Sequence, residues 1–424
     1  MSGGVRQAVP ADTQPKPLPE GWRCVRLGEV CEMNPRRPSD LIRADDDATT
    51  FVPMQAVDET HGAITRPELR PFREVRKGYT YFAENDVLFA KITPCMQNGK
   101  HAIARSLVGG FGFGTTEFHV LRPSPAIIAE WIHFFVRQPE VLQNAKAYFT
   151  GAVGQQRVPE TYLADLEIPL PPQEEQKRVA AILNEQITAV ERARAAAEAR
   201  LEAAKALPAA YLRAVFSSPE AQQWPRVPLG ELAILGPDNG VFKHRHEFGH
   251  GVPMVNVSDL YRSLTVDLAS AERVQVTDNE LRRFAISPGD LFFCRSSLKR
   301  EGVGWCCYVQ EVPEPSVFEC HVMRVRLDPQ KASPEFIAHY WAHSPVLEEV
   351  VGNSRTATMT TMNQADLAGV CVPLPPLSAQ QRIAATLNDQ MASAERTRRA
   401  IQEELDTINR LPAALLRRAF CGEL

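Results

Sequence analysis

Four polar loops carry the side chains of this chain that are best suited to binding nucleic acid. Two of them follow apolar runs, "AKITPCMQNGKHAIAR" from Ala90 and "CRSSLKREGVGW" from Cys294. The other two contain glycine and come later, "TGAVGQQRV" from Thr150 and "VGNSRTATMTTMN" from Val351. Arg, Lys, Asn and Gln present donors that match guanine and adenine edges, whereas Ser, Thr and backbone amides suit phosphate oxygens.

Taken as sets, these loops predict a DNA-binding surface, although each residue alone could equally be a solvated loop side chain. The candidate DNA-binding residues are Lys91, Gln97, Asn98, Lys100, Arg105, Gln155, Gln156, Arg157, Arg295, Ser297, Lys299, Arg300, Arg355 and Thr356.

Two other motifs resemble catalytic elements but lack the structural context that the chemistry requires. "HEFGH" from His246 matches the H-E-x-x-H zinc motif, which needs both histidines on one helical face. Gly249 and Gly251 interrupt that stretch, so we expect no zinc there. "GGFGFG" from Gly109 lacks the strand-then-helix frame of a nucleotide-binding loop, and we expect a strand-flanking turn. We therefore predict no catalytic residue and no metal site in this chain.

The elements that must position the loops are duplicated. "IPLPPQEEQKRVAAILNEQ" begins at Ile168, and "VPLPPLSAQQRIAATLNDQ" follows 204 residues later at Val372. At the same offset, "LPAAYLRAVF" from Leu207 matches "LPAALLRRAF" from Leu411. Such self-similarity indicates a repeated domain plus helix rather than a short-period solenoid.

A long helix is predicted after each Pro-Pro pair, because proline excludes helix before it and helix formers follow. The helices should begin near Gln173 and Leu377 and end before Pro208 and Pro412, each followed by a short arm. Apolar residues spaced 3 and 4 apart predict a coiled-coil seam, while two ordinary amphipathic helices on separate domains remain the alternative. The predicted seam positions are Val179, Leu183, Ile187, Val190, Arg194, Leu201, Ile383, Leu387, Met391, Arg398, Ile401, Leu405 and Ile408.

Composition limits the other functional classes. Lys+Arg 47 against Asp+Glu 51 gives a formal net charge of -4, so the chain has no global positive field to hold a polyanion. Nine cysteines without a CxxC motif are typical of buried thiols in a reducing cytosol. No apolar run approaches the ~20 residues of a membrane span. We expect a cytoplasmic protein with no membrane contact.

Alternating apolar runs such as "DVLFAKI" and "VMRVRL", separated by Gly, Pro and Asn, predict an α+β fold with mixed α/β domains. The predicted organisation is a disordered leader at 1–20, a first domain at 21–170, a central helical region at 171–216, a linker at 217–223, a second domain at 224–374 and a distal helical region at 375–424.

The motifs "LPEGWRCVRLGEV", "GTTEFHVLRP", "IPLPPQEEQKRVAAIL" and "LLRRAFCGEL", with the block repeated, resemble the specificity subunit of Type I restriction-modification systems. The resemblance spans about residue 19 to 424. It implies two similar target recognition domains, each reading one half of a split, asymmetric target in double-stranded DNA. It also implies that two long antiparallel coiled-coil helices separate them as a pseudo-twofold spacer. One departure is "PPLSAQQ" in the second copy, where the first has "PPQEEQ".

The same resemblance implies partners rather than a cofactor in this chain. Two modification (adenine methyltransferase) subunits and restriction (translocase/nuclease) subunits would dock on the helices, and those partners would bind S-adenosylmethionine and ATP. The alternatives from other classes are a stand-alone nucleic-acid-binding or scaffold protein with a coiled-coil spacer, and a zinc hydrolase built on "HEFGH".

Overall fold

The computed structural model describes residues 18–152, 155–297, 302–343, 355–356 and 360–424. Most of the expected leader, and the candidates Lys299 and Arg300, lie outside these ranges. The chain divides into two compact units: unit 1 holds residues 1–196 and 404–424, and unit 2 holds residues 197–403. Each unit therefore combines one mixed domain with half of each long helix.

Unit 1 contains two four-stranded sheets beside short helices. One sheet has the order β2-β11-β8-β9, and the other has the order β6-β3-β10-β7. The strands are β1 Arg23–Arg26, β2 Cys31–Met33, β3 Ala48–Val52, β4 Val57–Asp58, β5 Ala63–Ile64, β6 Glu68–Pro71, β7 Thr80–Ala83, β8 Val87–Ala90, β9 His101–Ile103, β10 Phe111–Gly114, β11 Phe118–Pro123 and β12 Glu167–Leu170. The short helices are α1 Leu27–Val30, α2 Phe72–Val75, α3 Ala129–Val136, α4 Pro139–Ala145 and α5 Glu160–Ala164.

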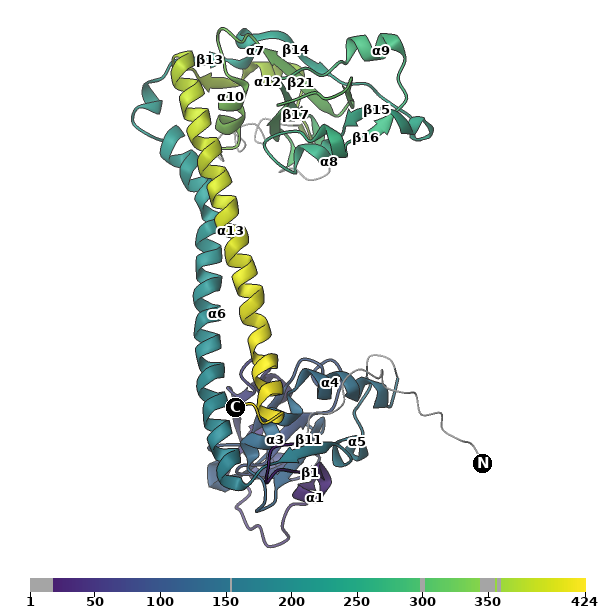
Figure 1. Cartoon of the computed structure of the whole chain (residues 1–424), viewed down its shortest axis with the longest axis vertical. Coiled ribbons are helices and arrows are strands. Elements are labelled where there is room, and N and C mark those ends of the chain that lie inside the picture. The colour runs from purple at the N-terminus through teal and green to yellow at the C-terminus, as the bar shows by residue number, and fades with distance from the viewer. Residues whose placement is uncertain (1–17, 153–154, 298–301, 344–354, 357–359) are drawn as a thin grey trace. The chain divides into compact units, whose positions relative to one another are not determined.

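Unit 2 repeats much of this arrangement around the sheet β14-β21-β17-β19. Its strands are β13 Arg226–Pro228, β14 Ala233–Asn239, β15 Phe248–Val255, β16 Glu272–Val274, β17 Asp290–Cys294, β18 Ser296–Ser297, β19 Cys306–Tyr308, β20 Val317–Phe318, β21 Val322–Leu327, β22 Arg355–Thr356, β23 Thr360–Thr361 and β24 Cys371–Pro373. Its short helices include α7 Leu229–Leu232, α8 Val257–Leu260, α9 Asp278–Arg283, α10 Pro334–Trp341 and α12 Gln364–Gly369. Figure 1 shows α10 between this sheet and the start of the long helix α13.

The offset of 204 found in the helices also relates the two central sheets. β11 pairs antiparallel with β8 so that Leu121 lies opposite Val87, and β21 pairs with β17 so that Val325 lies opposite Leu291. A buried aspartate at the start of the central strand binds an arginine on its neighbour in each unit. The Arg122–Asp86 bonds are 2.9 and 2.8 Å, and the Arg326–Asp290 bonds are 2.6 and 2.9 Å. The duplication therefore includes the domain cores.

The two long helices are α6 Gln173–Phe216 and α13 Leu377–Phe420. Both begin where the Pro-Pro pairs predict. The predicted breaks at Pro208 and Pro412 are wrong, because both prolines lie inside continuous helices. An interior proline costs about 3 kcal/mol. Leu212, Phe216 and their counterparts one turn or more beyond the prolines are buried in the domain cores, and this packing keeps the chain helical.

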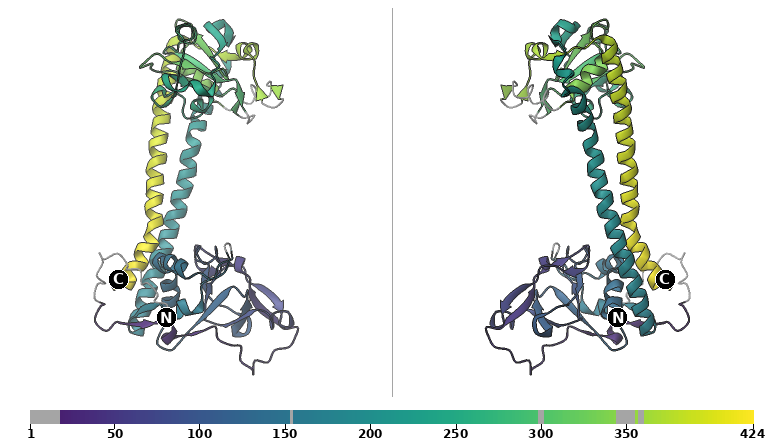
Figure 2. Two further views of the ribbon diagram at one scale, coloured as in Figure 1. Left: turned by 90° about the vertical axis from the view of Figure 1, so that its right-hand side faces the viewer. Right: turned by 90° about the vertical axis from the view of Figure 1, so that its left-hand side faces the viewer.

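Each long helix begins on the mixed domain of one unit and ends on the mixed domain of the other. In unit 1, the ring of Phe420 at the end of α13 lies 4.4 Å from that of Trp131 on α3. In unit 2, Phe216 at the end of α6 lies 5.6 Å from Phe336 on α10. The end of α13 lies beside the start of α6 in unit 1 in both views of Figure 2. Since the first half of one helix packs with the last half of the other in each unit, the two helices are antiparallel there.

A buried glutamine fixes the start of each long helix. Gln176 accepts a hydrogen bond from the amide of Ile128 (3.0 Å) and donates to the carbonyls of Ala126 (3.0 Å) and Pro171 (2.9 Å). Gln380, 204 residues later, accepts from the amide of Ser333 and donates to the carbonyls of Lys331 and Pro375. Both side chains are fully buried. These bonds attach helix, Pro-Pro segment and domain to one another.

Within the described ranges, no helix has both the length and the apolar character to cross a membrane.

Candidate nucleic-acid interface

The two candidate loops of unit 1 meet at the end of β8. The amide of Thr93 donates to the carbonyl of Gln156, and the amide of Val158 donates to the carbonyl of Lys91, both at 2.9 Å. Ile92 and Arg157 form an isolated antiparallel bridge. Residues more than 60 positions apart in the sequence are thus brought together at one edge of the domain.

The two candidate loops of unit 2 meet in the same way. Ser296 lies opposite Thr361 in the pair β18–β23, and the amide of Met362 donates to the carbonyl of Arg295 at 2.9 Å. These contacts repeat those of unit 1 at the offset of 204, because Arg295 corresponds to Lys91 and Thr361 corresponds to Arg157. The three-stranded sheet β18-β23-β22 also brings Arg355 and Thr356 to this place.

The two candidate loops of unit 1 form what we call the unit 1 cluster. Its lysine and arginine side chains differ in how firmly the protein holds them. Arg157 donates two bonds to Glu117, from Nε (2.8 Å) and Nη2 (2.7 Å), and this pairing holds the pKa of the Glu117 carboxyl below its usual range. Lys100 donates to the carbonyl of Val57 at 2.9 Å and lies 3.5 Å from Glu59, and Arg105 is paired with Glu130. These three are already engaged.

The remaining unit 1 candidates are less constrained. Gln97, Asn98 and Gln155 are exposed, and Gln156 and Lys91 are half-buried. Lys91 contributes to lowering the Glu117 pKa through its charge, which places its ammonium group near that carboxylate. The loop that follows β8 therefore presents polar side chains to solvent around one held arginine.

In unit 2 the held arginine is Arg295, although its counterpart in unit 1 is Lys91. Its amide donates to the carbonyl of His321 at 2.8 Å, and its Nη1 donates to the carbonyl of Cys320 at 3.3 Å. Ser297 is half-buried on β18. None of these contacts tests DNA binding, so the role of all candidate residues stays a prediction.

Sequence analysis missed the residues that hold the unit 1 cluster. Asn34 has a left-handed backbone (φ 47) and its Nδ2 lies 3.1 Å from Nδ1 of His119. The other ring nitrogen of His119 lies 2.9 Å from the carbonyl oxygen of Val158, and burial lowers the pKa of His119. The positions of Glu117 and His119 in "TTEFHV" carry no spacing signal that would have singled them out.

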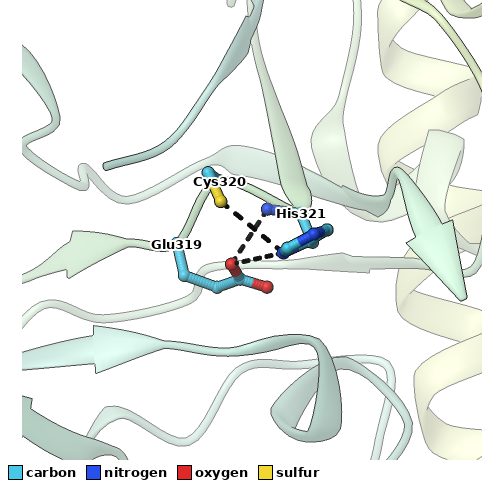
Figure 3. A group of neighbouring side chains, drawn as sticks. All are labelled: Glu319, Cys320 and His321. Carbon is cyan, nitrogen blue, oxygen red and sulfur yellow. Dashed lines mark hydrogen bonds and ion pairs between the residues drawn. The ribbon is translucent and has the colours of Figure 1, made fainter. Parts of the chain in front are cut away.

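One group of possible metal ligands occurs in the part of the chain that the structure describes, Glu319, Cys320 and His321 (Figure 3). The Glu319 carboxylate accepts from the amide of His321 at 2.9 Å and lies 3.0 Å from its Nδ1. Burial and the Glu319 charge raise the pKa of the Cys320 thiol. The carboxylate is thus used to shape the turn that supports Arg295, and the thiol stays protonated.

The "HEFGH" stretch is not a helix. His246 lies in a short 3-10 turn at 245–247, and His250 lies in β15. The ring of His246 is stacked on His244 at 5.7 Å, whereas His250 contacts Gln275. The two histidines do not share a helical face, so this stretch lacks the geometry of the zinc motif.

All of the predicted seam positions of α6 and α13 are buried or half-buried. The fully or mostly buried ones are Val179, Leu183, Leu201, Leu387, Ile401, Leu405 and Ile408. The half-buried ones are Ile187, Val190, Arg194, Ile383, Met391 and Arg398. Arg398 is bound by Glu395 on its own helix at 2.8 and 2.9 Å.

The chain thus contains two α+β domains with equivalent loop pairs, and each domain is joined to both long helices. This architecture is that of an internally duplicated two-domain protein. Comparison with known families agrees: the model of the Type I restriction modification DNA specificity domain matches twice, over residues 19–198 and 222–407. The chain belongs to this family.

Two curated relatives illustrate how the similarity is distributed. The chain is 38% identical to the specificity subunit of the Type I restriction enzyme EcoEI of Escherichia coli over 172 residues, 40% of this chain. That match spans only 28% of the length of the EcoEI subunit. Against the EcoKI subunit of E. coli K12 it is 26% identical over 318 residues, covering 72% of this chain and 68% of that protein.

Two solved structures share the fold. A chain from a study of complex assembly and conformational transition of the type I R-M system gives a TM-score of 0.73, with 24% identity, and covers 97% of this chain and 100% of that chain. The HsdS subunit from Thermoanaerobacter tengcongensis gives a TM-score of 0.67, with 24% identity, and covers 97% and 99%.

Proposed function

We propose that this chain is the DNA recognition subunit of a Type I restriction-modification complex. Each mixed domain reads one half of a bipartite target in double-stranded DNA through the loop pair at the end of its central strand. Because the two loop pairs differ in side chains, the two half-sites differ and the target is asymmetric.

The observation that carries this proposal is the equivalence of the two loop pairs. The contacts of Lys91 with Val158 and of Arg295 with Met362 repeat at one offset, although the side chains around them differ, with Glu117 and Arg157 where unit 2 has His321 and Thr361. The two units share a backbone arrangement but display different polar groups on it. This suits two domains that recognise different DNA sequences, because contacts to bases determine the sequence while the backbone positions the side chains that make them.

The remaining chemistry belongs to partners. Two modification subunits dock on the pseudo-twofold helices, since a duplicated surface offers two equivalent sites. Restriction subunits complete the complex. This chain is not catalytic, the S-adenosylmethionine and ATP that the reactions consume are bound by the partners, and the complex acts in the cytoplasm.

The test is to map adenine methylation in a host that expresses this chain with its modification subunit. A single split motif, absent when this chain is omitted, supports the proposal. Methylation that does not depend on this chain, or the absence of any motif from an active modification subunit, contradicts it.

A further inference from the structure

Unit 2 contains a cavity of about 850 Å³ between its mixed domain and the two long helices. One wall is α6 from Lys205 to Arg213 together with Ser217 just after the helix, and the opposite wall is the loop 261–265. Trp305 and Tyr308 line it from the sheet side, with the end of α10 and the Asn388–Met391 turn of α13. Cavities of this size with mainly aromatic and apolar walls are typical of small-molecule sites.

The charge on the lining is of one sign. Lys205, Arg213 and Arg262 line the cavity, and no aspartate or glutamate does so among the described residues. Lys205 is paired with Glu202 and Arg262 with Asp259, both of which lie outside the lining. Arg213 forms no hydrogen bond or ion pair with any residue that the structure describes. Its charge instead contributes to lowering the pKa of His343, after burial.

In unit 1, the corresponding residues line two smaller cavities, of about 670 and 260 Å³. Ungapped alignment of "VPMQAVDETHGAIT" from Val52 with "VPMVNVSDLYRSLT" from Val252 pairs Gly62 with Arg262. Alignment of "AEWIHFFVR" from Ala129 with "PEFIAHYWA" from Pro334 pairs Arg137 with Ala342.

Arg137 fills the space in unit 1 by donating to the carbonyls of Glu59 (3.0 Å) and Thr60 (2.7 Å). A Cβ on Gly62 would meet its guanidinium at 2.0 Å, so the loop must be glycine there. The cavity left in unit 1 beside Arg137 is about 260 Å³. In unit 2, Ala342 leaves the space empty and the loop arginine turns to Asp259. The difference between the copies is therefore that one cavity in unit 2 spans the loop and the end of α6, whereas in unit 1 the loop at 61–64 and the end of α13 line separate, smaller cavities.

The unit 2 cavity also offers hydrogen-bond groups. Ser217 Oγ lies 3.2 Å from Nε2 of His343, so a hydroxyl and an imidazole meet beside Arg213. Trp305 and Tyr261 both line the cavity and are edge-on to each other, with ring centroids 6.0 Å apart.

We propose that this cavity binds an aromatic anion of nucleotide size, a nucleoside phosphate. The ring lies among Trp305, Tyr261 and Leu212, where apolar and aromatic walls accept a planar group. The phosphates lie toward Arg213 and the Ser217–His343 pair, because a guanidinium binds phosphate oxygens strongly and Arg213 has no carboxylate partner among the described residues.

The experiment titrates the full chain with mant-ADP and follows fluorescence. Saturable binding is expected, and unlabelled ADP should compete while adenosine and pyrophosphate, which carry only the ring or only the charge, compete at least about tenfold less well. Ala342→Arg places in unit 2 the side chain that occupies the equivalent position in unit 1, and it should abolish binding.

Arg213→Ala is the second variant, in case Ala342→Arg does not fold, and it should weaken mant-ADP by about tenfold or more. Its matched control is Arg417→Ala, the exposed residue 204 positions later on α13, which should bind like the parent. Absence of saturable binding to the parent overturns the proposal. So does binding that survives both the Arg213→Ala and the Ala342→Arg substitutions in folded protein.

Discussion

Lys91 and Arg295 are the residues at which the two domains can be compared most directly. They occupy equivalent backbone positions, each bonded through its carbonyl to the later loop of its own domain. A loop held in this way presents its side chain on a rigid frame. The different choice of cation matters, because a guanidinium can bind a guanine edge through two bonds whereas an ammonium group acts as a point charge.

We therefore predict different consequences for Lys91→Ala and Arg295→Ala. Loss of a phosphate contact at Lys91 should weaken binding to all sequences and lower the salt slope by about one, whereas loss of a base contact at Arg295 should relax one target position by ~1–3 kcal/mol. Binding measured at several salt concentrations on matched and mismatched duplexes separates the two. Lys177→Ala on α6 removes an exposed cation outside the loops and is the control. Parent-like binding by both loop variants would show that these loops do not contact DNA.

His133 gives the fold a predictable dependence on pH. Burial, followed by the charge of Arg137, lowers its pKa from the ordinary 6.5 to about 3, so it stays neutral in the folded protein. Its Nε2 donates to the carbonyl of His101 at 3.0 Å. Because the unfolded chain binds a proton at a higher pH than the folded chain does, stability falls as the pH drops below about 6.5.

The His133→Gln variant keeps an amide donor and removes the titration. Between pH 7 and pH 5, the free energy of unfolding of this variant should fall by about 1–2 kcal/mol less than that of the parent. Urea unfolding at both pH values measures this difference. His101, also buried with a lowered pKa, keeps titrating in the variant, so the dependence is reduced and not abolished. An unchanged pH dependence would mean that His133 is solvated or protonated in the folded state.

At the scale of the elements, the long helices show what sequence can and cannot predict. Their starts at Gln173 and Leu377 follow from local chemistry, since Pro-Pro excludes helix and strong helix formers follow. The strands β8, β11 and β21 follow from short apolar runs between turn residues. The predicted helix ends before Pro208 and Pro412 were wrong. The free-energy cost of an interior proline can be read from the local sequence, whereas the burial of Phe216 and Phe420 that offsets it depends on distant residues.

The loops of the candidate site could be predicted from the sequence, but the way in which they pair could not. Residue types identified the four loops, but their pairing depends on bonds such as Thr93 to Gln156, which only the fold determines. The engagement of Arg157 by Glu117 was not predictable either, because "TTEFHV" and "TGAVGQQRV" lie far apart in the sequence and carry no mutual spacing.

Gln176 tests the attachment of helix to domain. Gln176→Leu would leave the amide of Ile128 and two carbonyls without their partner, and a buried unpaired polar group costs ~1–3 kcal/mol. We expect unit 1 to lose at least about 2 kcal/mol of stability in urea unfolding. Gln173→Leu, which removes one exposed bond of 3.2 Å to Pro125, is the control and should stay within about 0.5 kcal/mol of the parent. Equal effects of the two changes would show that the buried glutamine is dispensable.

At the scale of the whole molecule, the separate hydrophobic cores of the two units predict that each domain recognises its half of the DNA target independently. Each unit has its own buried cluster, and each loop pair is built within one unit. Exchange of residues 22–167 for the equivalent region of a relative should therefore change only one half of the split motif. Methylation mapping of the chimera measures this. The junctions precede the Pro-Pro segment, so Gln176 and its bond to Pro171 are retained, while the backbone groups at 126 and 128 that it also binds come from the relative. A change in both half-sites would contradict independent reading.

The helices themselves provide the last test, because each runs from one unit into the other, at residues 196–197 in α6 and 403–404 in α13. Insertion of seven helix-forming residues at both points adds two helical turns, keeps the heptad pattern and disturbs neither core. Each helix then lengthens by ~10 Å, and since duplex DNA rises 3.4 Å per base pair, the unspecified gap should widen by up to ~3 base pairs.

Both half-site sequences should stay the same in this variant, because the loop pairs lie within the units. Insertion of four residues at both points is the control: it breaks the heptad pattern and rotates each apolar face, so it should lower stability and activity. The measurement is the methylation motif of each variant beside that of the parent. A folded and active seven-residue variant with an unchanged gap would mean that the partners, and not α6 and α13, set the distance between the two readers.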